Sequence, residues 1–101
     1  MARKYQNAAP SGHTILVIDD SPDIVQSSRY LLEAEGHRVV TATDGPSGIA
    51  MAEQEHPHLI LVDYFMPGIT GEDVVREIRK RDRLVQIILQ TGYSGEKPAR
   101  V

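Results

Sequence analysis

Several features are missing from this chain of 101 residues, and each absence narrows what the protein can be. There is no cysteine, which excludes a disulfide framework and a thiolate metal site. No apolar run approaches the length of a transmembrane helix, and the N-terminus lacks the apolar core of a signal peptide. We therefore expect a cytoplasmic protein that has no membrane partner.

A large excess of basic residues is also absent. The net charge of −3 argues against nucleic-acid binding as the main task of this segment. Apolar residues make up 41% of the chain and charged residues 25%, which is ordinary for a soluble globular fold. The length allows one small domain with a thin core.

Short apolar runs alternate with amphipathic segments along the chain. Runs of this length, rich in β-branched residues, predict strands that are buried on both faces of a parallel sheet. We expect strands at 14–18, 37–42, 58–62 and 86–90, and helices that start at Ser21, follow Pro46 and span 71–81. The first helix is expected to turn its apolar positions toward the sheet, namely Ile24, Val25, Ser28, Leu31 and Leu32. The second is expected to do so with Ile49, Ala50 and Ala52. This alternation predicts a doubly wound parallel α/β sheet with right-handed crossovers.

Three carboxylates stand at the ends of predicted strands. Asp19 and Asp20 close the first run, and Asp63 closes the third. An Asp pair before a helix can simply favour that helix, and a lone Asp after a strand is often a turn residue. However, the carboxyl ends of neighbouring strands meet at the binding crevice of an open α/β sheet. Three acids there would repel one another unless a cation joined them, and Mg²⁺ prefers such oxygen ligands.

Three motifs together resemble the receiver domain of bacterial response regulators. They are ILVIDD at 15–20, LILVDYFMPG at 59–68 with Gly71 opening the next helix, and IILQTG at 87–92. The resemblance spans about residues 14–92 and implies the flavodoxin-like receiver fold with strand order 2-1-3-4-5.

The resemblance also implies roles for individual residues. Asp63 is expected to be the phosphoacceptor and to take part in the metal site. Asp20 is expected to bind Mg²⁺ directly, Asp19 to help through the water shell of the metal, and the backbone carbonyl of Phe65 to complete the protein ligands. Thr91 is expected to be the switch hydroxyl that bonds the phosphoryl group.

One departure from the family pattern concerns the C-terminus. The family has a fifth strand that ends in a lysine, whereas this chain stops ten residues after Thr91 and its Lys97 comes too early to be that lysine. We therefore expect a flexible leader at 1–13, a partial receiver domain at 14–92 that lacks the fifth strand and final helix, and a polar tail or the start of a fourth helix at 93–101. The apolar strand at 86–90 would then have an unpaired edge, so we expect self-association through it.

The function that follows is a phosphoryl-accepting signalling module served by a sensor histidine kinase or a phosphotransfer protein. It is expected to promote its own phosphorylation and not to act as an enzyme on a separate substrate. One alternative is a receiver-like scaffold or dimerisation module that has lost switching. The other is a phosphatase of the haloacid-dehalogenase kind, which needs a second Asp two residues after the nucleophile, where Phe65 stands. The four histidines show no shared metal-site spacing, and we interpret them as surface or packing residues: His13, His37, His56 and His58.

Overall fold

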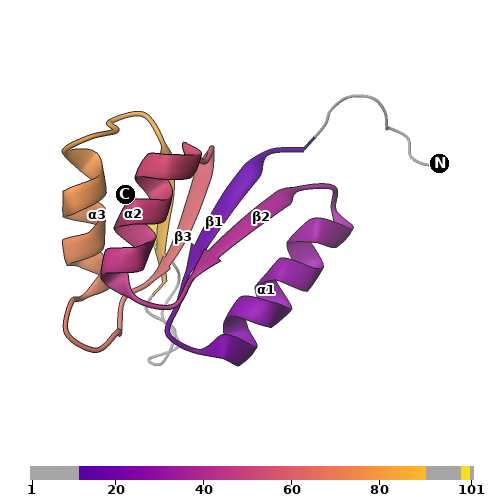
Figure 1. Cartoon of the computed structure of the whole chain (residues 1–101), viewed down its shortest axis with the longest axis horizontal. Coiled ribbons are helices and arrows are strands. Elements are labelled where there is room, and N and C mark those ends of the chain that lie inside the picture. Colours follow the sequence, from indigo (N-terminus) through magenta and orange to yellow (C-terminus); the bar gives the residue numbers. More distant parts are fainter. Residues whose placement is uncertain (1–11, 91–98, 101) are drawn as a thin grey trace.

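The computed structural model describes residues 12–90 and 99–100, which form one sheet and three helices (Figure 1). In chain order the elements are β1 (Thr14–Ile18), α1 (Pro22–Ala34), β2 (Arg38–Ala42), α2 (Gly45–Glu55), β3 (Leu59–Asp63), α3 (Gly71–Arg79), β4 (Gln86–Gln90) and β5 (Ala99–Arg100). The strand order is β2-β1-β3-β4-β5, and the first four strands are parallel. The predicted fold class is therefore confirmed.

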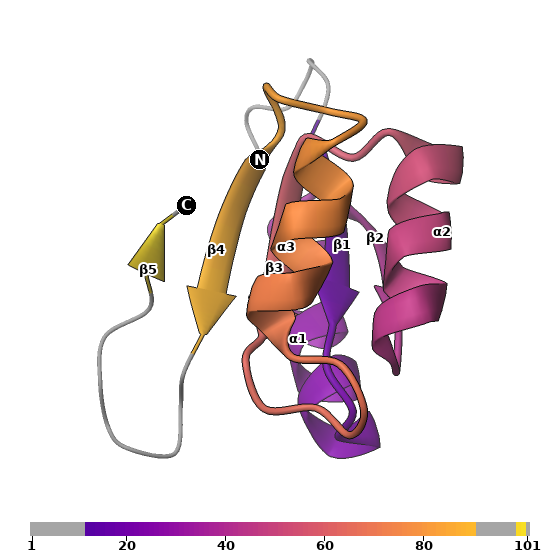
Figure 2. The ribbon, with the colours of Figure 1, turned by 90° about the vertical axis from the view of Figure 1, so that its left-hand side faces the viewer.

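The helices cover the two faces of the sheet unequally. Alternate residues of β1 point to opposite faces, as expected for a strand. Leu16 and Ile18 belong to the larger apolar cluster, which also contains residues of α2 and α3. Ile15 and Val17 belong to a smaller cluster together with Val25 of α1. Among the described residues, helix α1 thus lies alone on one face, and α2 and α3 lie side by side on the other (Figure 2).

Helix α1 buries a narrower stripe than the sequence predicts. Val25 is buried and Leu32 packs at the edge of the smaller cluster, but the side chains of Ile24 and Leu31 are 48% and 64% exposed. The prediction that these two residues face the sheet was wrong. Because α1 packs mainly against β1 and β2, only one line of its side chains reaches the sheet. In α2, Ala50 is likewise exposed.

The edge of β4 differs from the expectation as well. Ala99 and Arg100 form a two-residue strand that pairs antiparallel with Leu89 and Ile88. The expectation of an unpaired β4 edge was therefore wrong at Ile88 and Leu89. An antiparallel partner needs only a short return, whereas a parallel one needs a crossover of about a dozen residues or more.

The part of the chain that the structure describes contains no helix long and apolar enough to cross a membrane.

Candidate functional site

Three carboxylates from two neighbouring strands meet at the carboxyl end of the sheet. Asp19 directly follows β1 and Asp63 is the last residue of β3, and these strands are paired so that Ile18 lies opposite Val62. One carboxylate oxygen each of Asp19, Asp20 and Asp63 lie within 4.8 Å of one another. The three acids therefore lie together at the strand ends, as the sequence predicts. Asp19 and Asp63 are each only 8% exposed, whereas Asp20 is open to solvent.

The start of α1 fixes the first two acids. The backbone NH of Asp19 donates to the carbonyl of Ala42, which extends the β1–β2 pairing by one residue. Its carboxylate accepts a hydrogen bond from the backbone NH of Ser21 at 2.9 Å. Ser21 in turn caps α1, and Pro22 occupies the first helical position. The helix thus begins two residues after Asp20, which restricts the backbone of Asp19 and Asp20.

The start of α3 lies against the backbone of Asp63. The NH of Gly71 donates to the carbonyl of Tyr64 at 2.8 Å. A Cβ atom on Gly71 would lie 2.4 Å from the carbonyl oxygen of Asp63, closer than van der Waals contact allows. Only glycine permits the helix to approach so closely.

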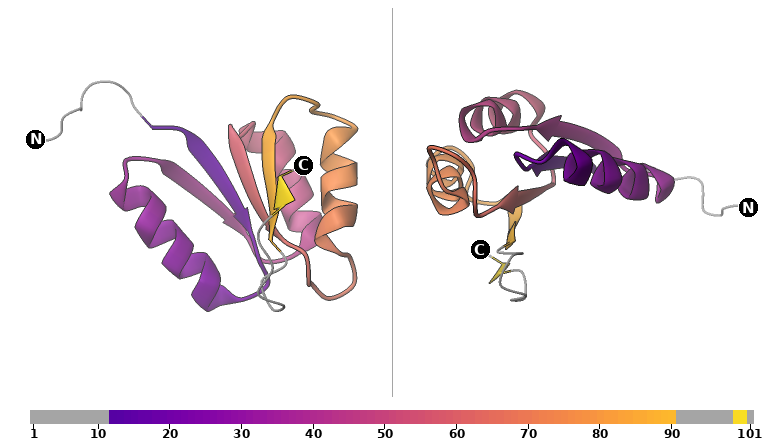
Figure 3. Two further views of the ribbon diagram at one scale, coloured as in Figure 1. Left: turned by 180° about the vertical axis from the view of Figure 1, so that it is seen from behind. Right: turned by 90° about the horizontal axis from the view of Figure 1, so that it is seen from below.

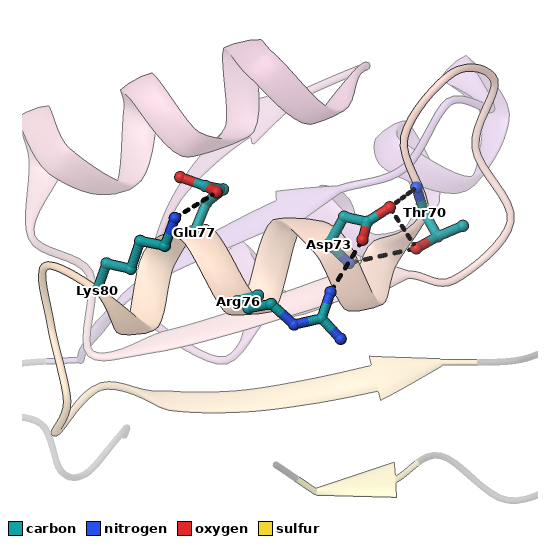
Figure 4. A network of polar contacts seen from close by, with 5 residues as sticks. All are labelled: Thr70, Asp73, Arg76, Glu77 and Lys80. Atoms are coloured by element: carbon teal, nitrogen blue, oxygen red, sulfur yellow. Dashed lines mark hydrogen bonds and ion pairs between the residues drawn. The ribbon is translucent and has the colours of Figure 1, made fainter.

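A capping box holds the same helix end (Figure 4). The Oγ1 atom of Thr70 accepts from the backbone NH of Asp73 at 3.2 Å, and the Asp73 carboxylate accepts from the backbone NH of Thr70 at 3.3 Å. Arg76 donates to the other carboxylate oxygen of Asp73 at 3.0 Å. Thr70 and Asp73 were not predicted from the sequence, although a Thr followed three residues later by an acid is a signal for this cap.

Burial and the neighbouring acids raise the pKa of two carboxylates in the site. Burial raises the pKa of Asp63 most, the charge of Asp19 raises it further, and a hydrogen bond from the backbone NH of Phe65 acts in the opposite direction. Burial also raises the pKa of Asp19, while the bond from Ser21 lowers it and the charge of Asp20 raises it. A divalent cation would relieve this repulsion, and an all-carboxylate set suits a hard ion such as Mg²⁺.

Two further predicted site residues have different outcomes. Phe65 lies in the loop after Asp63, where its side chain is 48% exposed and its ring meets that of Tyr64 edge-on at 4.9 Å. Thr91 lies outside the described residues, so its role stays a prediction. Its preceding residue, Gln90, pairs with Asp63 in the register of β3 and β4.

The histidines lie at the opposite end of the sheet. The Nδ1 atoms of His37 and His58 accept hydrogen bonds from the backbone NH groups of His13 and Thr14, at 3.1 and 3.0 Å. The rings of His13 and His58 meet edge-on at 5.0 Å. These contacts tie the starts of three strands together, in agreement with a packing role.

Comparison with known proteins extends these observations. A family model described as the response regulator receiver domain matches residues 15–100. The alkaline phosphatase synthesis transcriptional regulatory protein PhoP of Bacillus subtilis is 37% identical over 82 residues, which are 81% of this chain and 34% of that protein. The chain therefore spans about a third of the length of this curated relative.

Solved structures give the same result. The response regulator protein TrrA of Thermotoga maritima, in complex with Mg²⁺ and BeF, has a TM-score of 0.76 at 38% identity, with 80% of this chain and 70% of that chain covered. TrrA in complex with the histidine kinase ThkA has a TM-score of 0.75 at 37% identity and covers 83% of this chain and 72% of that chain. The fold and site thus define an acid-bearing doubly wound α/β domain. The chain belongs to the response regulator receiver domain family of two-component systems.

Proposed function

We propose that this chain accepts a phosphoryl group on Asp63. One observation carries the proposal: in a receiver domain, the carboxylates of Asp19, Asp20 and Asp63 converge where β1 and β3 end. A carboxylate oxygen of Asp63 attacks the phosphorus of a phosphohistidine, the phosphorus–nitrogen bond breaks, and the leaving imidazole takes up a proton. The product is an acyl phosphate.

The proposed cofactor is Mg²⁺. Asp20 and Asp63 would hold it directly, Asp19 through bound water, and the backbone carbonyl of Phe65 would complete the protein ligands. When bound, the ion supplies positive charge that offsets the charge developing on the phosphoryl oxygens. Thr91 would donate its hydroxyl hydrogen to the phosphoryl group. The Mg²⁺ and BeF found with TrrA support this assignment.

The proposed phosphoryl donor is a sensor histidine kinase or a phosphotransfer protein. The complex of TrrA with its kinase supports a partner of this kind. We propose that the chain meets its donor in the cytoplasm and promotes only its own phosphorylation. The position two residues after Asp63 holds Phe65, which cannot serve as the general acid that a phosphatase of the haloacid-dehalogenase kind requires.

The test is mass spectrometry after incubation with acetyl phosphate, with and without Mg²⁺. We expect one phosphoryl adduct that depends on Mg²⁺ and disappears in Asp63→Asn. Asp23→Asn is the matched control, because Asp23 is an exposed acid in the first turn of α1. An adduct that persists in Asp63→Asn would overturn the assignment.

We further propose that the chain self-associates along β4. Strand β5 pairs with two of the five residues of β4. On the face that carries α1, Leu59, Leu61 and Ile88 are only half-buried. A second copy that pairs there would cover both the edge and these side chains.

A further inference from the structure

A cavity of about 390 Å³ lies between the second halves of α2 and α3. Its lining includes Pro57 just before β3 and Val85 just before β4, so it opens at the amino ends of the strands. The acidic group lies at their carboxyl ends, so the cavity is a separate place in the fold. Figure 3 shows the two helices side by side along one face of the sheet.

The floor of the cavity is apolar and fixed. Ile60, Ile78 and Val85 form it and are 0%, 3% and 6% exposed, so they belong to the packed core. Ile49 and Ala52 of α2 form one wall and are half-buried. These residues come from two helices and two strand starts, which makes the cavity preformed. Its volume falls within the range of about 300–1,000 Å³ that small-molecule sites occupy.

The mouth of the cavity favours positive charge. Glu53 and Asp82 are the acidic residues of the lining, which also includes His56 and Arg81. The carboxylate of Asp82 is held in place by hydrogen bonds from the NH groups of Leu84 and Val85 at 2.9 and 3.1 Å. The guanidinium of Arg81 lies 3.7 Å from Glu53 and 4.0 Å from Glu77, so two carboxylates already share its charge.

The backbone adds to this preference. Helices α2 and α3 both end at the mouth, and helix C-termini carry partial negative charge. Arg81 already lies beside Glu53 and Glu77, so an anion gains little from it, whereas a cation can approach the carboxylate of Asp82 and share that of Glu53.

We propose that this cavity binds a small organic cation with an apolar body, such as a primary amine on a short alkyl chain. The chain would lie against Ile60, Ile78 and Val85, and the ammonium group would lie at the mouth beside Glu53. This binding is independent of the proposed phosphorylation, because no residue of the cavity belongs to the acidic group.

The experiment titrates the intact chain with hexylamine, hexanol and hexanoate and follows the backbone amide resonances by NMR. We expect saturable shifts at Ile78 and Val85, with hexylamine bound about fivefold more tightly than hexanol. Hexanoate should bind most weakly. Equal or tighter binding of hexanoate, or no saturation by hexylamine, would overturn the proposal.

Two pairs of variants sharpen the test. Ala52→Leu should fill the cavity and abolish hexylamine binding, whereas Ala50→Leu on the exposed side of the same helix should leave it unchanged. Glu53→Gln should reduce the preference for hexylamine over hexanol, whereas Glu72→Gln at the far end of α3 should keep it. If Ala52→Leu does not fold, the Glu53→Gln titration decides: an unchanged preference refutes the assignment.

Discussion

The folded protein disfavours the ionised form of the Asp63 carboxylate. Its pKa is raised above the ordinary value of 3.8, first by burial and then by the neighbouring acids. A raised pKa in the folded state means that the ionised form destabilises the fold. That destabilisation is fully present above the raised pKa and is lost as the pH falls through it.

We therefore expect Asp63→Asn to be more stable than the native protein near pH 7 in the absence of divalent cations. Thermal unfolding in EDTA measures this, and the advantage should shrink as the pH is lowered toward about 4. Mg²⁺ should reduce it as well, because it stabilises the native site alone. Asp23→Asn serves as the control. A lower melting temperature for Asp63→Asn in EDTA would contradict this account of the site.

Phe65 is the bulky neighbour of the proposed phosphoacceptor. An aromatic side chain at this position would leave little room for a water molecule in line with a phosphoryl group on Asp63 and would offer that water no hydrogen bond. We expect slow loss of phosphate, and we expect Phe65→Asn combined with Tyr93→Glu to speed it several-fold. Tyr93 stands two residues after Thr91 in the sequence, as Phe65 does after Asp63, and lies outside the described residues. Release of radiolabelled phosphate over time is the measurement, and an unchanged or slower release in the double variant would refute the shielding role.

At the scale of single elements, the cap of α3 is the feature most open to test. Thr70→Ala removes the oxygen that accepts from the NH of Asp73. We expect a loss of about 1 kcal/mol in the free energy of unfolding, which is typical of such caps. Urea denaturation measures it, with Thr43→Ala, at an exposed position before α2, as the control. Equal stability of the two variants would show that the cap contributes little.

The strands and helices also show which features can be predicted from the sequence and which cannot. The bounds of β1 and β4 were predicted residue by residue, because short apolar runs with polar ends define buried strands sharply. The site acids followed from the same rule. The exposed flank of α1 did not, since the width of a buried stripe depends on what packs beside the helix. Nor did the role of Gly71, because a close approach to the carbonyl of Asp63 is a property of the assembled backbone.

At the scale of the whole molecule, one face of the sheet is only partly covered. Among the described residues, α1 is the only helix on that face, and it packs against β1 and β2. Leu61 and Ile88 are paired neighbours on β3 and β4, and both are half-buried. Burying such apolar surface is worth roughly 25 cal/mol per Å², so contact with another chain would gain free energy from covering it.

We therefore expect the chain to self-associate, most simply as a two-fold dimer that buries Ile88 and the edge of β4. Sedimentation velocity over a wide range of concentrations should show a rising average mass. Ile88→Glu should weaken the association, because a charged side chain would have to be desolvated in the interface. Leu84→Glu is the matched control, since Leu84 is 92% exposed in the loop before β4 and lies outside the proposed interface. A chain that stays monomeric at high concentration, or a dimer that Leu84→Glu weakens as much as Ile88→Glu does, would show that this face is not the contact.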